Sequence, residues 1–263
     1  GYECLRKFKR EGVEVLVIVG NHDQYMKNGE IHSLVPFESV ATIIDEITKV
    51  QLGGLNLLCI PYTEEDIRPQ LKSVKEKEST IVLGHLAVNG ALSGMGGYRL
   101  TGNLVPDDFK GFKRVFLGHF HFRQTLGDNI LYIGSLLQHS FGERGQKKGF
   151  FIYDLRSDAL EFVPIRSPEF LELEQPDERV FGNYVRLKAA NKSDVRKALE
   201  LGARGVVSTV VESTQLRKSV RPSLSSTEVV KRYVAESETT LDKRRLIRVG
   251  LSLLEESNGI HQD

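Results

Sequence analysis

Short, nearly continuous apolar segments recur along the first part of the chain. Residues 13–19 (VEVLVIV) are mostly β-branched, which is typical of a strand buried on both faces of a helix-covered sheet. Early segments are separated by helical stretches such as residues 63–78, and later ones by short turns. The pattern predicts a layered α/β sandwich with mixed sheets. The other expected strands of this part lie at 55–60, 80–83, 114–117, 130–133 and 150–155.

The chain begins with Gly1, not Met, and residues 1–12 have the pattern of a helix that leads directly into the first strand. No apolar signal segment with a cleavage site is present to explain this start. We therefore expect that an upstream portion is absent.

The composition changes near residues 164–180, where three prolines and several acidic residues indicate a domain boundary. Beyond it we expect a small βαβ-like unit and then a final helical region. We divide the chain at 1–165, 166–213 and 214–263. The expected elements are a strand at 183–189, a helix at 193–203 with Ser193 as N-cap, a strand at 205–213, a linker at 214–226 and a Ser225-to-Glu228 capping box.

Composition and charge limit the class of protein. The chain of 263 residues is 40% hydrophobic, and 36 basic against 35 acidic residues leave a net charge of +1. A packed core is therefore expected. Because no apolar run approaches the roughly 18 residues of a membrane span, we expect a soluble, cytoplasmic protein. Cys4 and Cys59 should both be reduced. The near-neutral net charge does not favour binding to nucleic acid. If a polyanion is the substrate, local basic patches or bound metal would have to supply the positive field that attracts it.

Polar side chains follow three of the expected strands directly, each after a glycine. In an open α/β sheet, ligand sites gather outside the carboxyl ends of the strands, so these side chains can converge on one crevice. Glycine permits a sharp turn and a close approach of the backbone. Imidazole nitrogens and an amide oxygen suit Mn, Fe or Zn. The motifs are Gly20-Asn21-His22-Asp23, Gly84-His85 and Gly118-His119-Phe120-His121.

Each motif alone has an ordinary structural interpretation. A single Gly-His after a strand is typical of a turn with a hydrogen-bonded histidine, and Asn-His-Asp also suits an Asx-type turn. Three such motifs together favour a functional site. His32, His139 and His261 lack this context, and we expect them to be structural or to face solvent.

These motifs resemble the third, fourth and fifth signature motifs of the calcineurin-like metallophosphoesterases. The resemblance implies a four-layer sandwich of mixed β-sheets flanked by helices, with a small α/β capping domain and a C-terminal helical segment. Within that superfamily, the chain is similar to the nuclease subunit of SbcCD-type double-strand-break repair exonucleases. The residues that carry this closer likeness are Tyr132-Ile133-Gly134-Ser135, Phe141-Gly142-Glu143 and Lys148-Gly149-Phe150.

The resemblance implies that Asn21, His85 and His119 hold one metal ion and that His121 belongs to a second. Two divalent ions are expected, with Mn²⁺ the first choice. Two metals about 3.5–4 Å apart neutralise a phosphodiester and lower the pKa of bound water.

His22 would not be a ligand. The resemblance implies that it contacts the scissile phosphate and helps to protonate or stabilise the leaving oxygen, a task that suits a histidine with a pKa near neutrality. Asp23 either orients His22 or caps the turn, and we favour the turn.

The chain also departs from the family pattern. Family members carry Asp-x-His and Gly-Asp-x-x-Asp motifs upstream, which supply the other ligands of the first metal and the bridging carboxylate. Neither motif occurs before Gly20, and nineteen residues leave no room for the two strands that carry them. We therefore expect this chain to bind at most one metal ion well and to be weak or inactive by itself.

Three further segments each have a structural and a functional interpretation. The glycine-rich residues 90–102 lack Gly-Lys-Ser/Thr and are not a P-loop. They form either a surface loop or a flap in which Tyr98 stacks on a base and Arg99 touches a phosphate. Basic clusters near the end are solvated faces or DNA contacts. These clusters are Arg217, Lys218 and Arg221, and Lys243, Arg244, Arg245 and Arg248.

A helical stripe near the end of the chain is formed by Leu246, Val249, Leu253 and Leu254. Core packing is the ordinary interpretation of such a stripe. The resemblance favours a contact with the coiled-coil ATPase subunit of the SbcC type.

We expect a metal-dependent DNA nuclease that acts as an exonuclease on double-stranded ends in repair or recombination. One alternative is another calcineurin-like phosphoesterase, which acts on a phosphoprotein or a small nucleotide. The other is a catalytically inactive module that binds DNA ends or the ATPase. The expected partners are DNA, an SbcC-type ATPase and a second copy of the chain.

Overall fold

The computed structural model describes residues 1–25, 31–94, 97–188, 190–209, 225–237, 239 and 241–259. The chain divides into two compact units, Gly1–Thr209 and Val210–Asp263. The first unit carries every residue of the expected metal site. It is a mixed α/β structure, as the sequence predicts.

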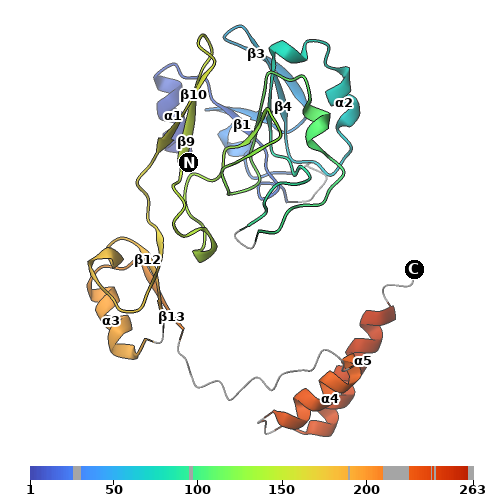
Figure 1. Cartoon of the computed structure of the whole chain (residues 1–263), viewed down its shortest axis with the longest axis vertical. Helices are drawn as coiled ribbons and strands as arrows, with labels where there is room; N and C mark the ends of the chain where they lie inside the picture. The colour runs from blue at the N-terminus through green and yellow to red at the C-terminus, as the bar shows by residue number, and fades with distance from the viewer. Residues whose placement is uncertain are drawn as a thin grey trace. The chain divides into compact units, whose positions relative to one another are not determined.

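The centre of the first unit is a six-stranded sheet of order β3-β4-β5-β6-β8-β7 (Figure 1). The pairs β4–β5, β5–β6 and β6–β8 are parallel, and β3 and β7 add antiparallel edges. The parallel register pairs Ile60 with Gly84 and Gly84 with Leu117, so the carboxyl ends of three strands are level. The bounds are β3 (Thr48–Leu52), β4 (Leu55–Ile60), β5 (Thr80–Gly84), β6 (Arg114–Leu117), β7 (Gln124–Leu126) and β8 (Ile130–Tyr132).

Both faces of the central strands are buried. Leu58 and Ile60 of β4 belong to a core cluster that includes Leu71 of helix α2 (Arg68–Ser73). Leu57 and Cys59, on the opposite face, belong to a second cluster. Because side chains alternate along a strand, a continuous apolar run is what a sheet covered on both faces requires.

The first expected strand is shorter and less buried than the sequence predicts. Strand β1 (Leu16–Ile18) has three residues, all half-buried, and pairs in parallel with β2 (Thr42–Ile44) in a separate two-stranded sheet. Of residues 13–19, only Val19 is buried. The expectation of a strand buried on both faces is therefore wrong here. The helix predicted at the start is present as α1 (Tyr2–Arg10).

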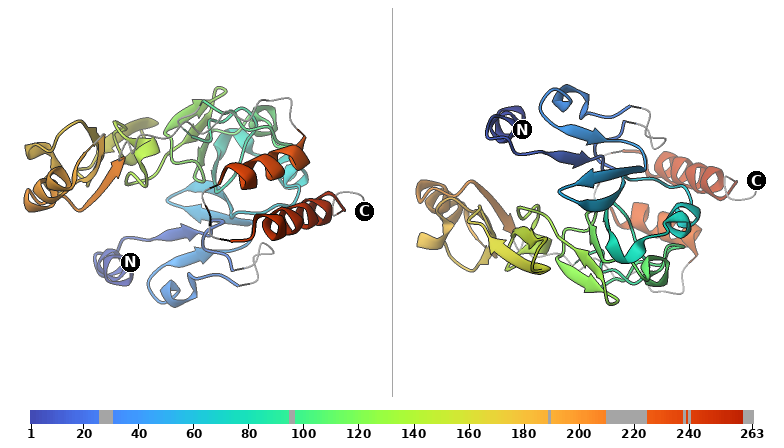
Figure 2. Two further views of the ribbon diagram at one scale, coloured as in Figure 1. Left: turned by 90° about the horizontal axis from the view of Figure 1, so that it is seen from below. Right: turned by 90° about the horizontal axis from the view of Figure 1, so that it is seen from above.

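A small α/β subdomain follows the hairpin of β9 (Gly149–Asp154) and β10 (Ala159–Pro164). Its strands β11 (Phe170–Leu173), β12 (Tyr184–Lys188) and β13 (Gly205–Thr209) are all parallel. Helix α3 (Lys192–Glu200) connects β12 to β13 and lies on one side of this sheet (Figure 2). The expected βαβ order is confirmed.

The N-cap of α3 is Asn191, not the predicted Ser193. The Asn191 side chain accepts hydrogen bonds from the backbone N–H groups of Ser193 and Asp194 at 2.8 and 3.0 Å. The Asp194 carboxylate in turn accepts from the Asn191 N–H. Asparagine and serine cap equally well, and this reciprocal pair with Asp194 fixes the helix start two residues earlier.

The second unit contains α4 (Ser226–Glu236) and α5 (Lys243–Gly259), which pack on each other. The predicted Ser225-to-Glu228 capping box is present. On α5, Val249 and Leu253 are 50% and 59% exposed, so α4 does not cover this part of the apolar stripe. Residues 214–224 of the expected linker lie outside the described residues.

Short 3-10 helices complete the described secondary structure. They are η1 (Val35–Phe37), η2 (Lys77–Ser79), η3 (Pro106–Phe109), η4 (Phe141–Glu143) and η5 (Glu178–Val180). Where the structure describes the chain, it shows no helix with the length and apolar character needed to cross a membrane.

Candidate metal centre

The backbone places His85 and His119 at the ends of two adjacent strands, β5 and β6. His85 follows β5, and its N–H donates to the carbonyl of Ile60 at the end of β4. Gly118 follows β6, and its N–H donates to the carbonyl of Gly84 at 2.8 Å. The ladder thus continues one residue past each strand, and His85 and His119 leave the sheet side by side.

Asn21 reaches the same place from β1. The Tyr62 N–H, two residues beyond β4, donates to the Val19 carbonyl at 2.8 Å, which holds the turn after β1 against the end of β4. Asn21 Oδ1 lies 2.9 Å from His85 Nε2 and 3.3 Å from His119 Nδ1. The structure therefore brings together the three side chains that the family resemblance assigns to one metal.

This donor set fits a divalent transition metal. One amide oxygen and two imidazole nitrogens are ligands that Mn, Fe and Zn accept. Two ligand atoms about 2.1 Å from an ion and at right angles to each other are about 3 Å apart, close to the two separations around Asn21 Oδ1. Across the described residues, no group of three or more His, Cys, Asp or Glu side chains is placed to hold a metal, so this cluster relies on its amide.

Two of the motif glycines, Gly20 and Gly118, leave room for the His85 ring. A Cβ at Gly20 would lie 2.8 Å from His85 Cε1, and one at Gly118 would lie 3.1 Å from His85 Nδ1. The imidazole therefore lies between the backbone of Gly20 and that of Gly118, where neither residue has a side chain. Any larger residue at Gly20 would have to displace the ring.

His119 has an unusual backbone conformation. Its φ is +85°, a region that non-glycine residues rarely occupy and that costs on the order of 1–3 kcal/mol. Its ring stacks on Tyr62 with centroids 5.9 Å apart, and Phe120 packs against it edge-on at 4.8 Å. Neighbouring aromatic rings thus fix the direction of His119. Tyr62 is a site residue that the sequence analysis missed.

The two clustered histidines are held neutral. Burial, helped by the nearby His119, lowers the pKa of His85 to about 4. Burial, followed by the proximity of His22 and His121, also lowers the pKa of His119. A neutral imidazole has a lone pair to offer, so the environment favours the form that binds metal.

The turn after β1 presents His22 to solvent. His22 is exposed. Asp23 Oδ2 accepts a hydrogen bond from the Gly20 N–H at 2.9 Å, and the Asp23 N–H donates to the Gly20 carbonyl. Asp23 therefore caps the turn, which is the role we favour.

His121 is oriented by a different set of residues. Its Nδ1 lies 2.8 Å from Glu143 Oε1, and the Lys148 ammonium lies 2.7 Å from the other Glu143 oxygen. Burial opposes ionisation of Glu143, but the hydrogen bonds from Lys148 and His121 outweigh it and lower its pKa. Neither Glu143 nor Lys148 was predicted as a site residue, although both lie in stretches that carry the family resemblance.

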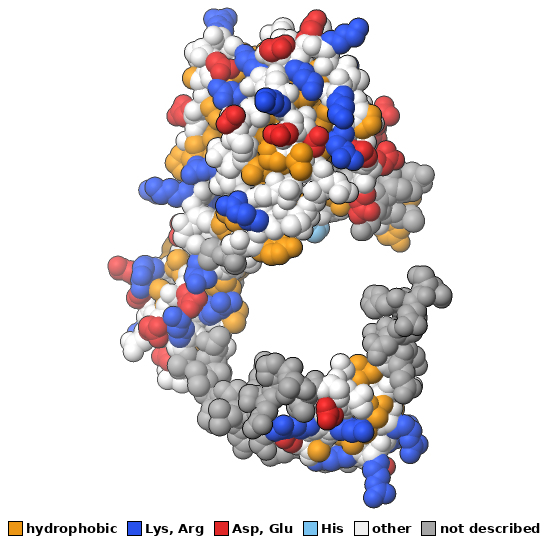
Figure 3. Space-filling view, turned by 45° about the vertical axis from the view of Figure 1, so that its right-hand side comes forward, with side chains coloured by type: hydrophobic (Ala, Val, Ile, Leu, Met, Phe, Trp, Pro, Cys, Tyr) orange, Lys and Arg blue, Asp and Glu red, His pale blue; other side chains and the backbone are white. Residues whose placement is uncertain are grey.

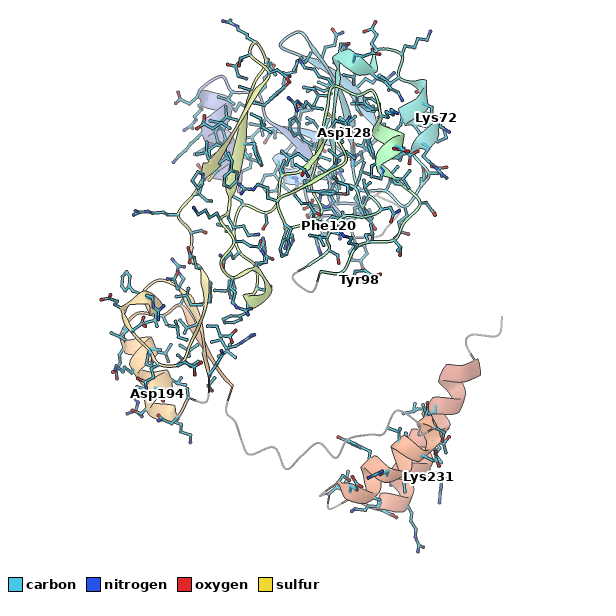
Figure 4. The ribbon with its side chains drawn as sticks, in the orientation of Figure 1. Lys72, Tyr98, Phe120, Asp128, Asp194 and Lys231 are labelled. Atoms are coloured by element: carbon cyan, nitrogen blue, oxygen red, sulfur yellow. The ribbon has the colours of Figure 1, made fainter. Side chains whose placement is uncertain are left out.

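The glycine-rich segment lies beside the histidines. A cavity of about 210 Å³ is lined by Ser93 and Gly94 of that segment and by His119 and His121. Tyr98 is 64% exposed, and Figure 4 places it at the same end of the first unit as Phe120. Arg99 Nη1 donates to the Gly90 carbonyl at 2.7 Å, so part of its guanidinium stabilises the loop itself.

The other histidines have separate environments. His32 is buried, accepts a hydrogen bond from the Leu34 N–H, and lies 3.5 Å from an Asp45 oxygen. His139 is exposed, and its ring packs 4.5 Å from that of His121. His261 lies outside the described residues.

Surface charge is mixed on the face drawn in Figure 3, where Lys and Arg alternate with Asp and Glu over the first unit. The basic residues of α5, namely Lys243, Arg244, Arg245 and Arg248, are exposed. The expected cluster of Arg217, Lys218 and Arg221 lies outside the described residues.

Gly20→Ala should disrupt the cluster without unfolding the protein. The new methyl group would push the His85 ring away from Asn21, and Mn²⁺ binding measured by isothermal titration should weaken about tenfold or more. Gly102→Ala is the matched control, because its Cβ would make only an ordinary contact, 3.8 Å from Leu100. Equal Mn²⁺ affinity in the two variants would contradict the steric role of Gly20.

The metal-free protein should lose stability as the pH falls from 7 to 5. The pKa of His85 is about 4 in the folded state and near 6.5 ordinarily. Between these values the unfolded chain binds more protons, so protonation favours unfolding. After solvent screening, the loss should be about 1 kcal/mol, measured by urea denaturation. His85→Gln should show a smaller pH dependence; an unchanged dependence would rule out His85 as its source.

Comparison with known proteins gives three informative relatives. The chain is 29% identical over 170 residues to exonuclease subunit 1 of Enterobacteria phage T4, covering 62% of this chain and 48% of the phage protein. It is 23% identical over 218 residues to the D subunit of nuclease SbcCD of Staphylococcus epidermidis, covering 68% and 57%. It is 34% identical over 118 residues to the corresponding Staphylococcus saprophyticus protein, covering 42% and 30%. No family model matches the chain.

The chain spans about half the length of the first two of these relatives. All three are named as nucleases or exonucleases, and two of them as a subunit of SbcCD. The predicted resemblance to SbcCD-type nuclease subunits is therefore confirmed: the chain is similar in sequence to such subunits and to the phage exonuclease subunit.

Proposed function

We propose that this chain is the nuclease subunit of a DNA repair or recombination complex and hydrolyses phosphodiester bonds at double-stranded ends. The observation that carries the proposal is the convergence of Asn21, His85 and His119 at the ends of adjacent strands, together with the similarity to the phage exonuclease and SbcCD nuclease sequences. Metal-dependent phosphodiester hydrolysis is the chemistry that suits this donor set.

Asn21, His85 and His119 would hold one divalent ion, and His121 would belong to a second. Mn²⁺ is the metal we propose for both. When bound, such ions neutralise the phosphate and lower the pKa of a water molecule. The neutral state of His85 and His119 prepares their nitrogens for this role, since no proton has to leave first.

His22 would hold the proton for the leaving oxygen. It lies next to a proposed ligand in sequence and is exposed, so its ring is accessible to a substrate. Asp23 fixes the turn that presents it. A positioned acid of this kind contributes on the order of 10²–10⁴-fold to a rate.

The wider organisation follows the same proposal. Residues 1–165 would form the nuclease domain, a four-layer metallophosphoesterase sandwich, and 166–213 the capping domain. Residues 214–263 would bind an SbcC-type ATPase through the exposed Val249 and Leu253 of α5, and two copies of the chain would associate in the complex.

One observation favours a second candidate. The described residues include no group of three His, Cys, Asp or Glu side chains placed around a metal, as a catalytically inactive module that binds DNA ends or the ATPase would also show. Assaying the full gene product with Mn²⁺ on linear duplex DNA separates the two. Cleavage supports the nuclease, and binding without cleavage supports the module. A parallel assay on bis-p-nitrophenyl phosphate identifies a phosphoesterase restricted to small substrates.

His22→Ala should abolish DNA cleavage by the full gene product and leave Mn²⁺ binding unchanged, because His22 is assigned to the leaving group and not to the metal. A loss of about 10²–10⁴-fold in rate is expected. Isothermal titration with Mn²⁺ provides the control. Retained cleavage would show that another group supplies the proton, and lost Mn²⁺ binding would show that His22 is a ligand.

The double variant Tyr98→Ala and Arg99→Ala should raise KM for DNA and spare hydrolysis of bis-p-nitrophenyl phosphate. Stacking on an aromatic ring stabilises a base by roughly 1–3 kcal/mol, so KM should rise about tenfold. Because Arg99 also holds the Gly90 carbonyl, Tyr98→Ala alone is the sharper variant. An equal loss on both substrates would argue that the segment only supports the site.

A further inference from the structure

A buried network lies behind His121. The side chains of Glu143 and Lys148 are 7% and 4% exposed, and their charged atoms lie 2.7 Å apart. Lys148 Nζ also donates to the His121 carbonyl and to Ser135 Oγ, both at 2.8 Å. The network therefore contacts His121 at two points: Glu143 hydrogen-bonds to its ring, and Lys148 to its backbone carbonyl.

We propose that Glu143 is a positioning residue that fixes the tautomer and direction of the His121 ring, with Lys148 holding the carboxylate in place. This inference rests on the proposed function, in which His121 binds a metal ion. With Nδ1 hydrogen-bonded to Glu143, the ring nitrogen left for a metal is Nε2.

The chemistry of the partners decides which way the hydrogen bond runs. Lys148 Nζ and the His139 N–H both donate to Glu143 Oε2, at 2.7 and 3.3 Å, so this group serves as an acceptor. The hydrogen must therefore come from His121 Nδ1. A carboxylate behind a metal-binding histidine orients the ring and makes it a stronger ligand, and its loss typically lowers metal affinity 10–100-fold.

The backbone around His121 is equally constrained. The Ser135 N–H donates to the His121 carbonyl at 3.2 Å. Gly134 has a φ of +77°, and a Cβ there would lie 3.1 Å from the His121 carbonyl oxygen. The segments 121–123 and 134–135 thus lie in direct contact, and only glycine fits between them.

The test uses the double variant Glu143→Leu with Lys148→Met. Removing one partner would leave a buried charge alone, whereas replacing both with apolar side chains of similar volume is tolerated in many proteins. In the metal-free wild-type protein, nitrogen NMR of the His121 ring should show the Nδ1–H tautomer. In the double variant, the Nε2–H form should become substantially populated, while the circular dichroism spectrum stays that of a folded protein.

A second measurement follows the chemical shift of His121 Nε2 as Zn²⁺ is added. Zn²⁺ suits the same imidazole ligands, and as a diamagnetic ion it does not broaden His121 from a neighbouring site, as Mn²⁺ would. The double variant should require about 10–100-fold more Zn²⁺ than wild type for the same shift. Asp158→Asn is the matched control. Asp158 also accepts a hydrogen bond from a basic side chain, Arg114, but it lies in the turn between β9 and β10, and asparagine tolerates its positive φ.

The outcomes separate this inference from the proposed function. An Nε2–H tautomer in the wild-type protein, or an unchanged tautomer in the folded double variant, would overturn the role of Glu143. If the double variant does not fold, Glu143→Gln alone gives the answer. Lys148 and the His139 N–H both need the amide oxygen, so the NH2 group faces His121 Nδ1 and should shift the ring toward the Nε2–H form. A ring that stays in the Nδ1–H form would overturn the inference. Wild-type protein that shows the Nδ1–H tautomer but no shift of His121 Nε2 with Zn²⁺ would overturn the metal-binding role of His121 and leave its positioning by Glu143 intact.

Discussion

The parallel register of β4, β5 and β6 is the constraint on which the candidate site depends. Because Ile60, Gly84 and Leu117 are level across the sheet, the residues that follow them emerge at one edge. Two backbone hydrogen bonds past the strand ends, from His85 to Ile60 and from Gly118 to Gly84, extend that order. A shift of one residue in either pairing would turn the alternate face of the strand toward the core and carry a histidine out of the cluster. The apolar residues that fix the register therefore also fix the site.

The sequence was informative where one physical demand dominated. The runs that become β4, β5, β6 and β8 are apolar on both faces, and their burial leaves little choice of structure. Strands β2, β3, β7, β10 and β11 were not predicted, because they are short or half-buried and their patterns resemble loops. For residues 13–19 the error was the opposite, because the prediction gave a longer and more deeply buried strand than the structure has. They are as apolar as a central strand, but β1 pairs only with β2 within the described residues, and composition does not reveal how many neighbours a strand has.

Site residues, too, could be predicted only where the order of the strands determines their position. Asn21, His85 and His119 could be placed together because each follows a strand, and the sheet converts that order into proximity. Tyr62 also follows a strand, but an aromatic residue carries no signal of its own for a metal site. Glu143 and Lys148 come from the loop between β8 and β9, where their contact with His121 depends on how the loop folds back. The resemblance pointed to their stretches of sequence, and only the structure shows that they share a hydrogen-bonded network with His121.

The two halves of the site are consequently built in different ways. The Asn21, His85 and His119 half is held by strand backbone and by glycines that leave room for a ring. The His121 half is held by side chains on the loop that also contacts the small α/β subdomain. Gln138 Oε1 accepts from the Phe170 N–H at 2.8 Å, and the Phe141 and Phe170 rings lie 5.0 Å apart. The loop residues that support His121 are thus tied to β11. A displacement of β11 would act first on this half, because the other half has its hydrogen bonds in the central sheet.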